Sequence, residues 1–206
     1  MSTNTTRSGL ARLRIVLWVG VAIAAITSGA LYLLREREPA LSPAQSYASA
    51  FGGTFEMVDQ TGRTVTDQTL RGRPYVIFFG FTRCPDVCPT TLSRMAALRK
   101  QMGADGEKFD IVFVSVDPEH DKAKDIGGYL DLFGTPIIGL TGTDAQIAQI
   151  AKAYRVYYAK VPVAGGDYTI DHTASVFLMD GEGRFVATID HKEDQKVALE
   201  KLKRLI

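Results

Sequence analysis

The sequence predicts an α/β domain in which helices cover both faces of a central mixed β-sheet. Two observations lead to this fold class. Apolar runs of strand length alternate with segments of helix length through the middle of the chain, which is typical of parallel strands joined by crossover helices. The chain then ends on a strand–turn–strand pattern and one more helix, so antiparallel strands are expected beside the parallel ones.

The predicted elements follow in order from a hairpin near residue 55. Residues 55–59 and 64–65 flank a turn at Gly62, and residues 75–81 form an apolar run without polar alternation, which predicts a strand covered on both faces. The remaining predicted elements are a helix over 89–100, a strand over 109–116, a helix over 122–133, a strand over 136–140, a helix over 144–154, short strands over 168–170 and 175–179, a strand over 184–189 and a helix over 193–205.

An uncharged apolar run precedes the domain. Residues 15–34 contain no charged side chain, and about 20 residues are enough for a helix to cross the hydrocarbon core of a membrane. Arg7, Arg12 and Arg14 stand before this run without an acidic residue, and basic flanks stay in the cytoplasm. We therefore expect a cytoplasmic segment at 1–14, a transmembrane anchor at 15–34, a polar linker at 35–50 and an exported domain at 51–206.

A cleaved signal peptide is the alternative for this segment. The small residues Ser28, Gly29 and Ala30 offer a cleavage site, but the apolar run continues to Leu34 and is longer than a usual signal core. We favour the uncleaved anchor. Both alternatives place the domain outside the cytoplasm. The expected location is the inner membrane, with the domain in the periplasm, or in the mitochondrial intermembrane space if the source is eukaryotic.

The charge of the chain is nearly balanced, with 24 basic and 23 acidic residues. After the apolar run there is no basic block and no alternation of aromatic and basic residues, so the sequence argues against a nucleic-acid partner. The sequence does predict a membrane as a partner, through the N-terminal helix.

Cys84 and Cys88 are the only cysteines, and both lie between the strand over 75–81 and the helix over 89–100. Pro89 suits the first helical position, which makes Cys88 the expected N-cap residue. Free N–H groups and the helix dipole at such a terminus favour a thiolate. A pair of thiols at this place can exchange disulfides or hold a soft metal ion.

A structural disulfide is the default for two cysteines in an oxidising compartment. The loop that it would close here is very short, and such a loop constrains the unfolded chain little. The exported domain is also long enough to bury a core without a covalent link. A functional pair is therefore the better hypothesis.

The spacing of the pair and the three histidines bear on its chemistry. A Cys-x-x-x-Cys gap is wider than the Cys-x-x-Cys gap of redox motifs, and two thiolates favour Cu(I), whereas structural zinc wants four ligands. His120 and His191 lie in polar stretches and are expected at the surface. His172 stands just before the strand over 175–179, where a thioredoxin-like fold brings a loop against the cysteines. Oxidoreductases of that fold carry a cis-proline there, and residues 171–174 contain no proline, so His172 is a candidate ligand of a Cys₂His copper site.

The segment 79–92, FGFTRCPDVCPTTL, resembles the signature of the Sco/SenC family, whose members are membrane-anchored copper chaperones of cytochrome c oxidase assembly. Segments 114–119 and 168–173 are also similar to family segments, and the resemblance extends from Phe51 to the C-terminus. It implies a thioredoxin-like fold. It also implies that copper, as Cu(I) or Cu(II), is bound by Cys84, Cys88 and His172.

The resemblance further implies delivery of the copper to the binuclear copper A centre of cytochrome c oxidase subunit II. Other periplasmic copper chaperones or thiol reductants would be further partners, and a disulfide between the two cysteines would switch binding off. Asp86 and Asp171, each next to or near a ligand in sequence, are candidates to support the ligands. Arg83 and His120 depart from what the resemblance leads us to expect at their positions.

Three functions are weighed on these grounds. The leading one is a metallochaperone that is not an enzyme. The alternative is a thiol–disulfide reductase that keeps the acceptor's cysteines reduced so that they can be metallated. A peroxidase is the weakest, because it needs a peroxidatic thiolate with a dedicated arginine and a resolving cysteine at a greater distance.

Overall fold

The computed structural model describes residues 5–35 and 50–206. Residues 36–49, which make up most of the predicted linker, lie outside the described residues, and so does the start of the predicted cytoplasmic segment. The chain divides into two compact units, Met1–Ser42 and Pro43–Ile206, and each is described by itself.

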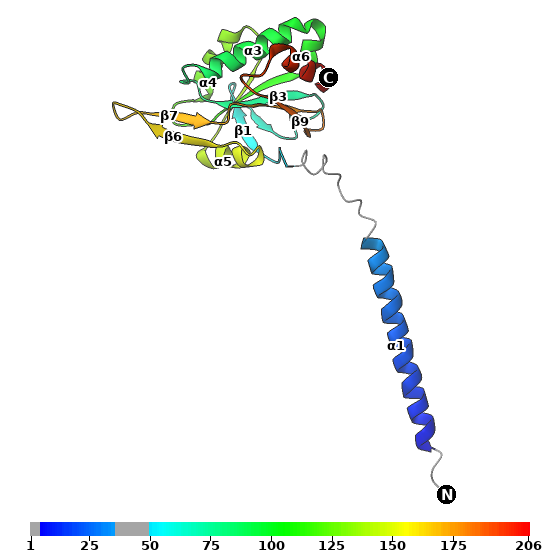
Figure 1. Cartoon of the computed structure of the whole chain (residues 1–206). Coiled ribbons are helices and arrows are strands. Elements are labelled where there is room, and N and C mark those ends of the chain that lie inside the picture. Colours follow the sequence, from blue (N-terminus) through cyan, green and yellow to red (C-terminus); the bar gives the residue numbers. More distant parts are fainter. Residues whose placement is uncertain (1–4, 36–49) are drawn as a thin grey trace. The chain divides into compact units, whose positions relative to one another are not determined.

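The described part of the first unit is one helix, α1 (Thr5–Arg35), as the apolar run predicts (Figure 1). The helix begins before the apolar run, because no proline interrupts the basic flank. Its stretch Arg12–Tyr32 is long and apolar enough to cross a membrane, and none of it is buried. The hydroxyl of Thr27 donates to the carbonyl oxygens of Ile23 and Ala24, which satisfies its polar group within the helix.

The second unit is built around a seven-stranded mixed sheet, as predicted. The strand order is β2-β1-β5-β4-β3-β8-β9, in which β3, β4 and β5 are parallel and the other neighbouring pairs are antiparallel. All residues of β3 are buried, in agreement with its unbroken apolar sequence. The strands are β1 (Glu56–Asp59), β2 (Thr64–Thr66), β3 (Tyr75–Gly80), β4 (Asp110–Ser115), β5 (Ile138–Thr141), β8 (Val176–Met179) and β9 (Phe185–Ile189).

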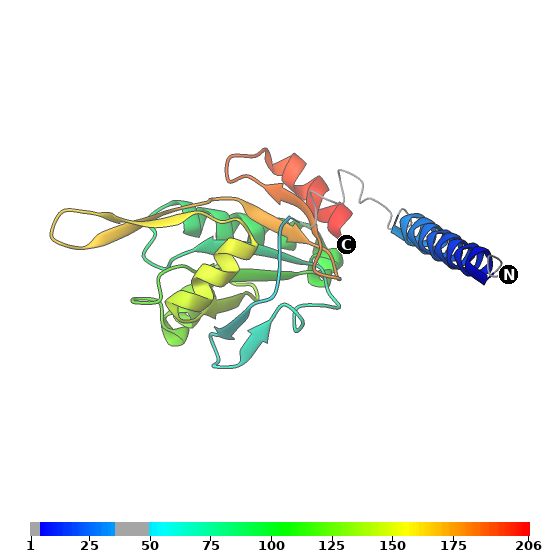
Figure 2. The ribbon, with the colours of Figure 1, turned by 90° about the horizontal axis from the view of Figure 1, so that it is seen from below.

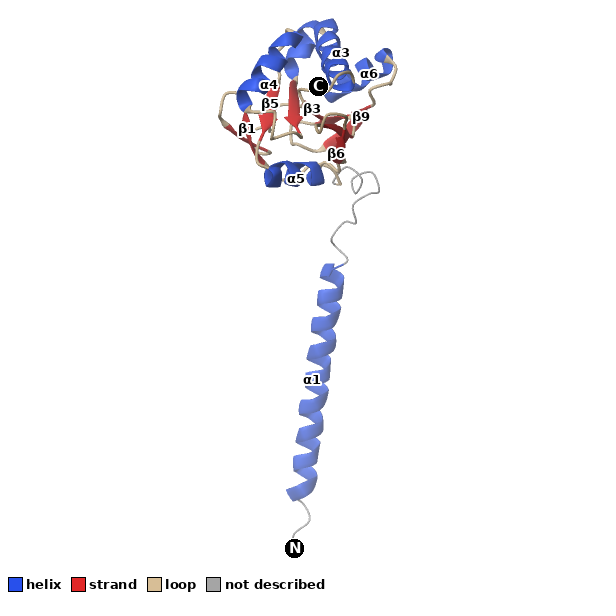
Figure 3. Cartoon of the chain, turned by 90° about the vertical axis from the view of Figure 1, so that its left-hand side faces the viewer, coloured by secondary structure: helices blue, strands red, loops and turns tan. Residues whose placement is uncertain are grey.

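Helices cover both faces of this sheet, as Figures 1 and 3 show from two sides. Three of them lie on one face and α5 lies on the other. The helices α3 and α4 connect parallel neighbours in the sheet, which is the usual role of a crossover helix. The helices are α3 (Val87–Gln101), α4 (Ala123–Leu130), α5 (Asp144–Ala153) and α6 (Gln195–Leu205), with 3₁₀ turns at Gly103–Lys108 and Asp131–Phe133.

The predicted helices and main-sheet strands are confirmed, with ends that shift by a few residues. The helix predicted over 122–133 is shorter than expected. It ends as α4 at Leu130 and continues as a 3₁₀ turn to Phe133, and Gly134 then adopts a left-handed φ of 61° that ends the helical segment.

The helix α3 begins earlier than predicted, and this changes the place of Cys88. The N-cap is Asp86, and Val87 is the first helical residue, so Cys88 lies inside the first turn. Pro89 remains compatible with the helix there, because the N–H groups of the first turn have no intrahelical partner. The prediction of Cys88 as the N-cap residue is therefore wrong, although Cys88 does lie at the helix N-terminus.

A separate two-stranded sheet projects from the domain in both Figure 1 and Figure 2. It consists of β6 (Tyr158–Pro162) and β7 (Tyr168–His172), paired antiparallel with Tyr158 opposite His172. Sequence analysis missed β6, which is short and contains no buried residue. It found only part of β7 and placed His172 outside the strand, whereas His172 is the last residue of β7.

The pairing of β8 with β3 brings the two halves of the predicted site to the same edge of the sheet. The strands are antiparallel, with Phe78 opposite Val176, so β8 begins where β3 ends. The chain after β3 carries Cys84, and the chain before β8 carries His172. Residues that are far apart in the sequence therefore meet at this edge.

A buried carboxylate holds the loop that follows β3. Asp121, which is fully buried, accepts a hydrogen bond from the backbone N–H of Thr82 at 2.9 Å and another from the Thr82 hydroxyl at 2.5 Å. The hydroxyl of Ser115, at the end of β4, donates to the same carboxylate at 2.6 Å. Because a buried carboxylate without partners is costly, these bonds keep the start of the cysteine loop next to β4.

Candidate metal centre

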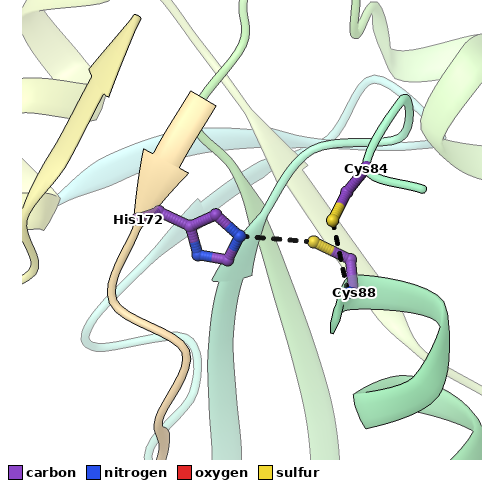
Figure 4. A group of neighbouring side chains, drawn as sticks. All are labelled: Cys84, Cys88 and His172. Carbon is purple, nitrogen blue, oxygen red and sulfur yellow. Dashed lines mark hydrogen bonds between the residues drawn. The ribbon is translucent and has the colours of Figure 1, made fainter. Parts of the chain in front are cut away.

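Two sulfur atoms and one imidazole nitrogen come together at the edge where β3 ends. The ligand atoms of Cys84, Cys88 and His172 all lie within 4.8 Å of one another, as Figure 4 illustrates. The three residues belong to the β3–α3 loop, the first turn of α3 and the end of β7. The structure thus brings together all three residues that the sequence predicts as ligands.

Cys84 lies in the loop between β3 and α3 and is partly exposed. Its backbone N–H donates to the carbonyl oxygen of Phe81 at 3.2 Å, which closes a tight turn after the strand. The N–H of Cys88, in the first turn of α3, donates to Cys84 Sγ at 3.4 Å. An N–H group of the helix terminus therefore donates to the sulfur of Cys84, whereas the sequence predicted such stabilisation for at least one of the two cysteines without saying which.

Cys88 is fully buried and packs against Gly80, the last residue of β3. A Cβ atom at Gly80 would lie 2.7 Å from Cys88 Sγ and 2.9 Å from the ring of Phe113, closer than real atoms approach. Only glycine leaves room for the sulfur at this position. Sequence analysis did not single out Gly80, and the available signal was a glycine at the end of a fully apolar strand.

The backbone sets the orientation of His172. Its Nδ1 lies 3.0 Å from the carbonyl oxygen of Thr173, which can only accept, so Nδ1 carries the proton. The other nitrogen, Nε2, then presents its lone pair and lies 3.4 Å from Cys88 Sγ. The rings of Phe78 and Phe81 each approach the imidazole edge-on, at 6.0 Å between centroids. This tautomer is the one that a metal bound at Nε2 requires.

The two thiols differ in their readiness to ionise. A hydrogen bond from the Cys88 thiol lowers the pKa of Cys84, and bonds from the backbone N–H groups of Cys88 and Asp86 act in the same direction against the effect of burial. The same coupling to Cys84, together with burial, raises the pKa of Cys88 above its ordinary value. In the metal-free protein, Cys84 is therefore the thiolate and Cys88 the protonated thiol.

The two aspartates that were predicted to support the ligands are both exposed. Asp86 is the N-cap of α3, and its side chain accepts a bond from the Thr90 hydroxyl at 3.3 Å. Its backbone N–H, and not its carboxylate, acts on Cys84. Asp171 precedes His172 on β7, and successive side chains of a strand point to opposite faces. The polar partner of His172 is the Thr173 carbonyl, which sequence analysis missed.

The other two histidines do not join the centre. His191 follows β9 and lies 3.6 Å from the carboxylate of Asp190. His120 was expected to be a solvated loop residue, and this is only partly correct. Its side chain is 38% exposed, but Nδ1 lies 3.1 Å from the buried carboxylate of Asp117 and 2.9 Å from the hydroxyl of Tyr168.

The donor set limits the chemistry of the centre. Two sulfurs and one imidazole nitrogen form a soft, three-donor site, and such donors suit Cu(I) and Zn²⁺ better than hard cations such as Mg²⁺ or Ca²⁺. Among the described residues, no histidine, cysteine or carboxylate adds a fourth ligand to this cluster, whereas structural zinc sites have four protein ligands. The same two sulfurs can also form a disulfide, and both are free thiols in the structure.

The sequence profile of the SCO1/SenC family matches residues 43–206. The chain belongs to the SCO1/SenC family. Its similarity to Bradyrhizobium japonicum ScoI, solved with copper bound, is 46% identity with a TM-score of 0.71, over 76% of this chain and 100% of the ScoI chain. Its likeness to this solved Sco structure confirms the thioredoxin-like fold.

Two other Sco proteins bear on the site. Arabidopsis thaliana mitochondrial SCO1 homolog 1 is 39% identical over 142 residues, which is 67% of this chain and 42% of the homologue. Across the first three relatives this share is 42% to 59%, so the chain spans about half the length of the curated relatives it matches. BsSco, a member of the Sco family of cytochrome c oxidase assembly proteins with a disulfide switch, is 25% identical with a TM-score of 0.60 over 76% of this chain and 94% of its own.

The difference between the thiols predicts a difference in alkylation. In the reduced protein, Cys84 should react with iodoacetamide faster than Cys88 at neutral pH. Because the pKa of Cys84 is lowered, its thiolate persists at neutral pH and its rate falls only as the pH drops through that lowered pKa. Site-resolved mass spectrometry against pH measures both rates, with the urea-unfolded protein as reference. Inflections for both cysteines at or above about 8.5, the value of a free thiol, would contradict the assignment.

The packing of Cys88 predicts that Gly80→Ala is harmful. The added methyl should displace Cys88 Sγ, lower the free energy of unfolding by about 1–3 kcal/mol and speed alkylation of Cys88. Gly128→Ala in α4 is the matched control, because a Cβ there meets nothing within 4 Å. Urea denaturation and the alkylation assay provide the two measurements. If Gly80→Ala matched Gly128→Ala in both, Gly80 would not be what makes room for the sulfur.

Proposed function

We propose that this protein is a membrane-anchored copper metallochaperone that binds copper through Cys84, Cys88 and His172. The observation that carries the proposal is the convergence of two thiols and one correctly oriented imidazole at an edge of the domain. Family membership supports it, and so does the copper bound to Bradyrhizobium japonicum ScoI. Copper is the cargo here, and it must be both held and released.

The three ligands would contribute differently to holding the ion. Two thiolates can hold Cu(I) almost linearly, so Cys84 and Cys88 are sufficient for the reduced ion. Cu(II) prefers further nitrogen or oxygen donors, and the lone pair of His172 Nε2 supplies one. The protein would therefore accept both oxidation states. Binding of either ion removes the proton of the Cys88 thiol, because the thiolate is the ligand.

Release would proceed by ligand exchange. A thiolate of the acceptor attacks the bound ion, and one sulfur of this protein then leaves it. Cys84 is the sulfur open to this exchange, since it is partly exposed on a loop, whereas Cys88 is buried in the helix. The thiolate form of Cys84 is already stabilised in the metal-free protein. When Cys84 leaves the ion, its negative charge is therefore not costly.

The acceptor that we propose is the binuclear copper A centre of cytochrome c oxidase subunit II. The support is the link of BsSco, a family member, to cytochrome c oxidase assembly. Other periplasmic copper chaperones would load the site, and thiol reductants would keep it reduced. We do not propose a separate enzymatic reaction for the copper-bound form.

A second function is favoured by the difference between the two thiols. As a thiol–disulfide reductase, the Cys84 thiolate would attack an acceptor disulfide and form a mixed disulfide, which releases one acceptor thiolate. Cys88, after losing its proton, would then attack Cys84 and release the second acceptor thiolate. The acceptor is reduced to a dithiol while Cys84 and Cys88 are oxidised to a disulfide. The disulfide switch of BsSco supports this alternative.

The proposed location follows from α1. Its apolar stretch would serve as an uncleaved, single-pass anchor in the inner membrane, with the domain in the periplasm or the mitochondrial intermembrane space. Sco relatives from both mitochondria and bacteria are consistent with either compartment. Such an anchor would keep the domain at the same membrane as a membrane-bound acceptor.

The ligand assignment predicts distinct losses in the binding variants. The full chain in detergent, reduced and free of oxygen, should bind one equivalent of copper, and Cys84→Ser or Cys88→Ser should abolish tight binding. His172→Ala should weaken Cu(II) binding more than Cu(I) binding. Chelator competition measures the Cu(I) affinity, and the thiolate-to-Cu(II) absorption reports the Cu(II) complex.

His191→Ala is the matched control, because His191 lies away from the centre. An equal loss of both ions in His172→Ala would mean that the imidazole supports the fold or the thiols and is not a ligand. If His172→Ala lost copper affinity but kept an unchanged rate of thiol–disulfide exchange, the two proposed functions would be separated. A wild-type chain that binds no copper would leave the reductase as the function.

The charge distribution around α1 predicts the orientation in the membrane. Alkaline phosphatase fused after residue 40 should be active, since the basic flank of the helix remains in the cytoplasm and the fusion point is exported. A reporter that is active only in the cytoplasm, fused at the same place, should be inactive. The reverse pattern would refute the proposed topology.

A further inference from the structure

A cluster of charged and polar side chains lies beside the centre without belonging to it. In this cluster Arg83 of the cysteine loop, Asp117 of the β4–α4 loop and Tyr168 of the β6–β7 hairpin meet. We call these three residues the clasp. Arg83 immediately precedes the ligand Cys84, and Tyr168 begins the strand that ends at the ligand His172. Each half of the centre therefore has one residue of the clasp on its own segment.

Asp117 is the middle of the clasp and is fully buried. Its carboxylate accepts a hydrogen bond from the Tyr168 hydroxyl at 2.6 Å, and an Arg83 nitrogen lies 3.4 Å away. The guanidinium of Arg83 also lies 5.3 Å from the centre of the Tyr168 ring. Because burying a carboxylate without hydrogen-bond partners is costly, Asp117 holds together two segments that are far apart in the sequence.

Further contacts reinforce the same junction. Arg83 forms an ion pair with Asp167, next to Tyr168, at 2.8 Å. A carboxylate oxygen of Glu119 lies 2.8 Å from the Tyr168 hydroxyl oxygen, and Glu119 pairs with Lys160 of β6 at 2.7 Å. Among the described residues, the polar side-chain contacts from the hairpin to the rest of the domain, apart from those of His172, go to Arg83 or to the β4–α4 loop.

The hairpin packs on the domain through the buried side chain of Ile170, and the polar contacts of the clasp add to this attachment. It forms its own two-stranded sheet and shares no strand pairing with the seven-stranded sheet, so the main ladder does not fix its angle. It extends away from the domain in Figures 1 and 2. Tyr168 and His172 are four residues apart on β7 and therefore lie on the same face of the strand. A force that draws Tyr168 towards the cysteine loop also turns His172 towards Cys88.

We propose that Arg83, Asp117 and Tyr168 are positioning residues, which hold β7 against the cysteine loop and thereby set the distance between the imidazole of His172 and the two sulfurs. None of the three is a ligand. The effect of the clasp on copper rests on the function proposed above, but its effect on the hairpin exists in the metal-free protein as well.

The clasp predicts a selective effect on the copper ions. Loosening the hairpin moves only the imidazole, since both cysteines lie on other segments. Cu(II), which depends on His172, should therefore be lost before Cu(I), which two thiolates can hold. A residue that merely stabilised the domain would weaken both ions and the fold together.

The test uses Tyr168→Phe, which removes the hydroxyl and keeps the ring. In the metal-free full chain, amide hydrogen exchange of residues 168–172 should become about tenfold faster, because the lost bond is to a charged carboxylate, while exchange in β4 stays unchanged. With copper added, the Cu(II) affinity should fall about tenfold with an altered Cu(II) absorption and nitrogen hyperfine pattern, and the Cu(I) affinity should stay within about twofold.

Tyr157→Phe is the matched control, because Tyr157 adjoins the hairpin and is 61% exposed. It should leave every readout unchanged, and Arg83→Gln should reproduce the Tyr168→Phe pattern. The proposal is overturned if exchange in β7 is unaltered by Tyr168→Phe, or if Cu(I) and Cu(II) affinities fall equally together with the melting temperature. If the wild type binds no copper, the proposed chaperone function fails, and hydrogen exchange alone decides whether the clasp holds the hairpin.

Discussion

β8 runs antiparallel to β3 with Val176 opposite Phe78, and that pairing brings the chain that carries His172 beside the loop that carries the two cysteines. Since β3 is an interior, fully buried strand, the start of β8 is held at the point where the cysteine loop leaves the sheet. An antiparallel neighbour is required, because only then does the chain entering β8 lie beside the chain leaving β3. A shift of the register by one residue would also send every side chain of β8 to the opposite face.

The centre built at this edge combines a firm part and a movable part. Cys88 is fixed by burial against Gly80, and the Thr173 carbonyl fixes the tautomer of His172. Cys84 lies on a loop, partly exposed, and receives the N–H bonds of the helix terminus. A site with this division can hold a soft ion and still offer one sulfur for exchange, whereas a closed four-ligand site would hold its ion too firmly.

Buried carboxylates organise the loops around the centre. Asp121 secures Thr82 before the cysteines, and Asp117 meets Arg83 and the hairpin residue Tyr168. Both aspartates follow β4, the parallel neighbour of β3, so their loop lies next to the cysteine loop. The charge of Asp121 contributes to the raised pKa of Cys88. The same loop thus positions the site and affects its protonation.

Much of this molecule follows from the sequence alone, because hydrophobic periodicity and local turn chemistry are properties of neighbouring residues. Such local patterns predict the central strands, the covering helices, the apolar helix, and the place of Cys84 and Cys88 beside a helix terminus. Even the place of His172 beside the cysteines could be anticipated, although on the fold's topology and not on its neighbours in the sequence.

The tertiary structure decided what depends on residues far apart in the chain. No residue of β6 is buried, and the strand is defined by its pairing with β7. Gly80 is required because a sulfur from α3 packs on it, and Arg83 matters through a buried carboxylate on another loop. The thiolate is assigned to Cys84 because hydrogen bonds from the N-terminus of α3 converge on its sulfur. None of these contacts can be read from hydrophobic periodicity, since each forms only when the folded chain brings the groups together.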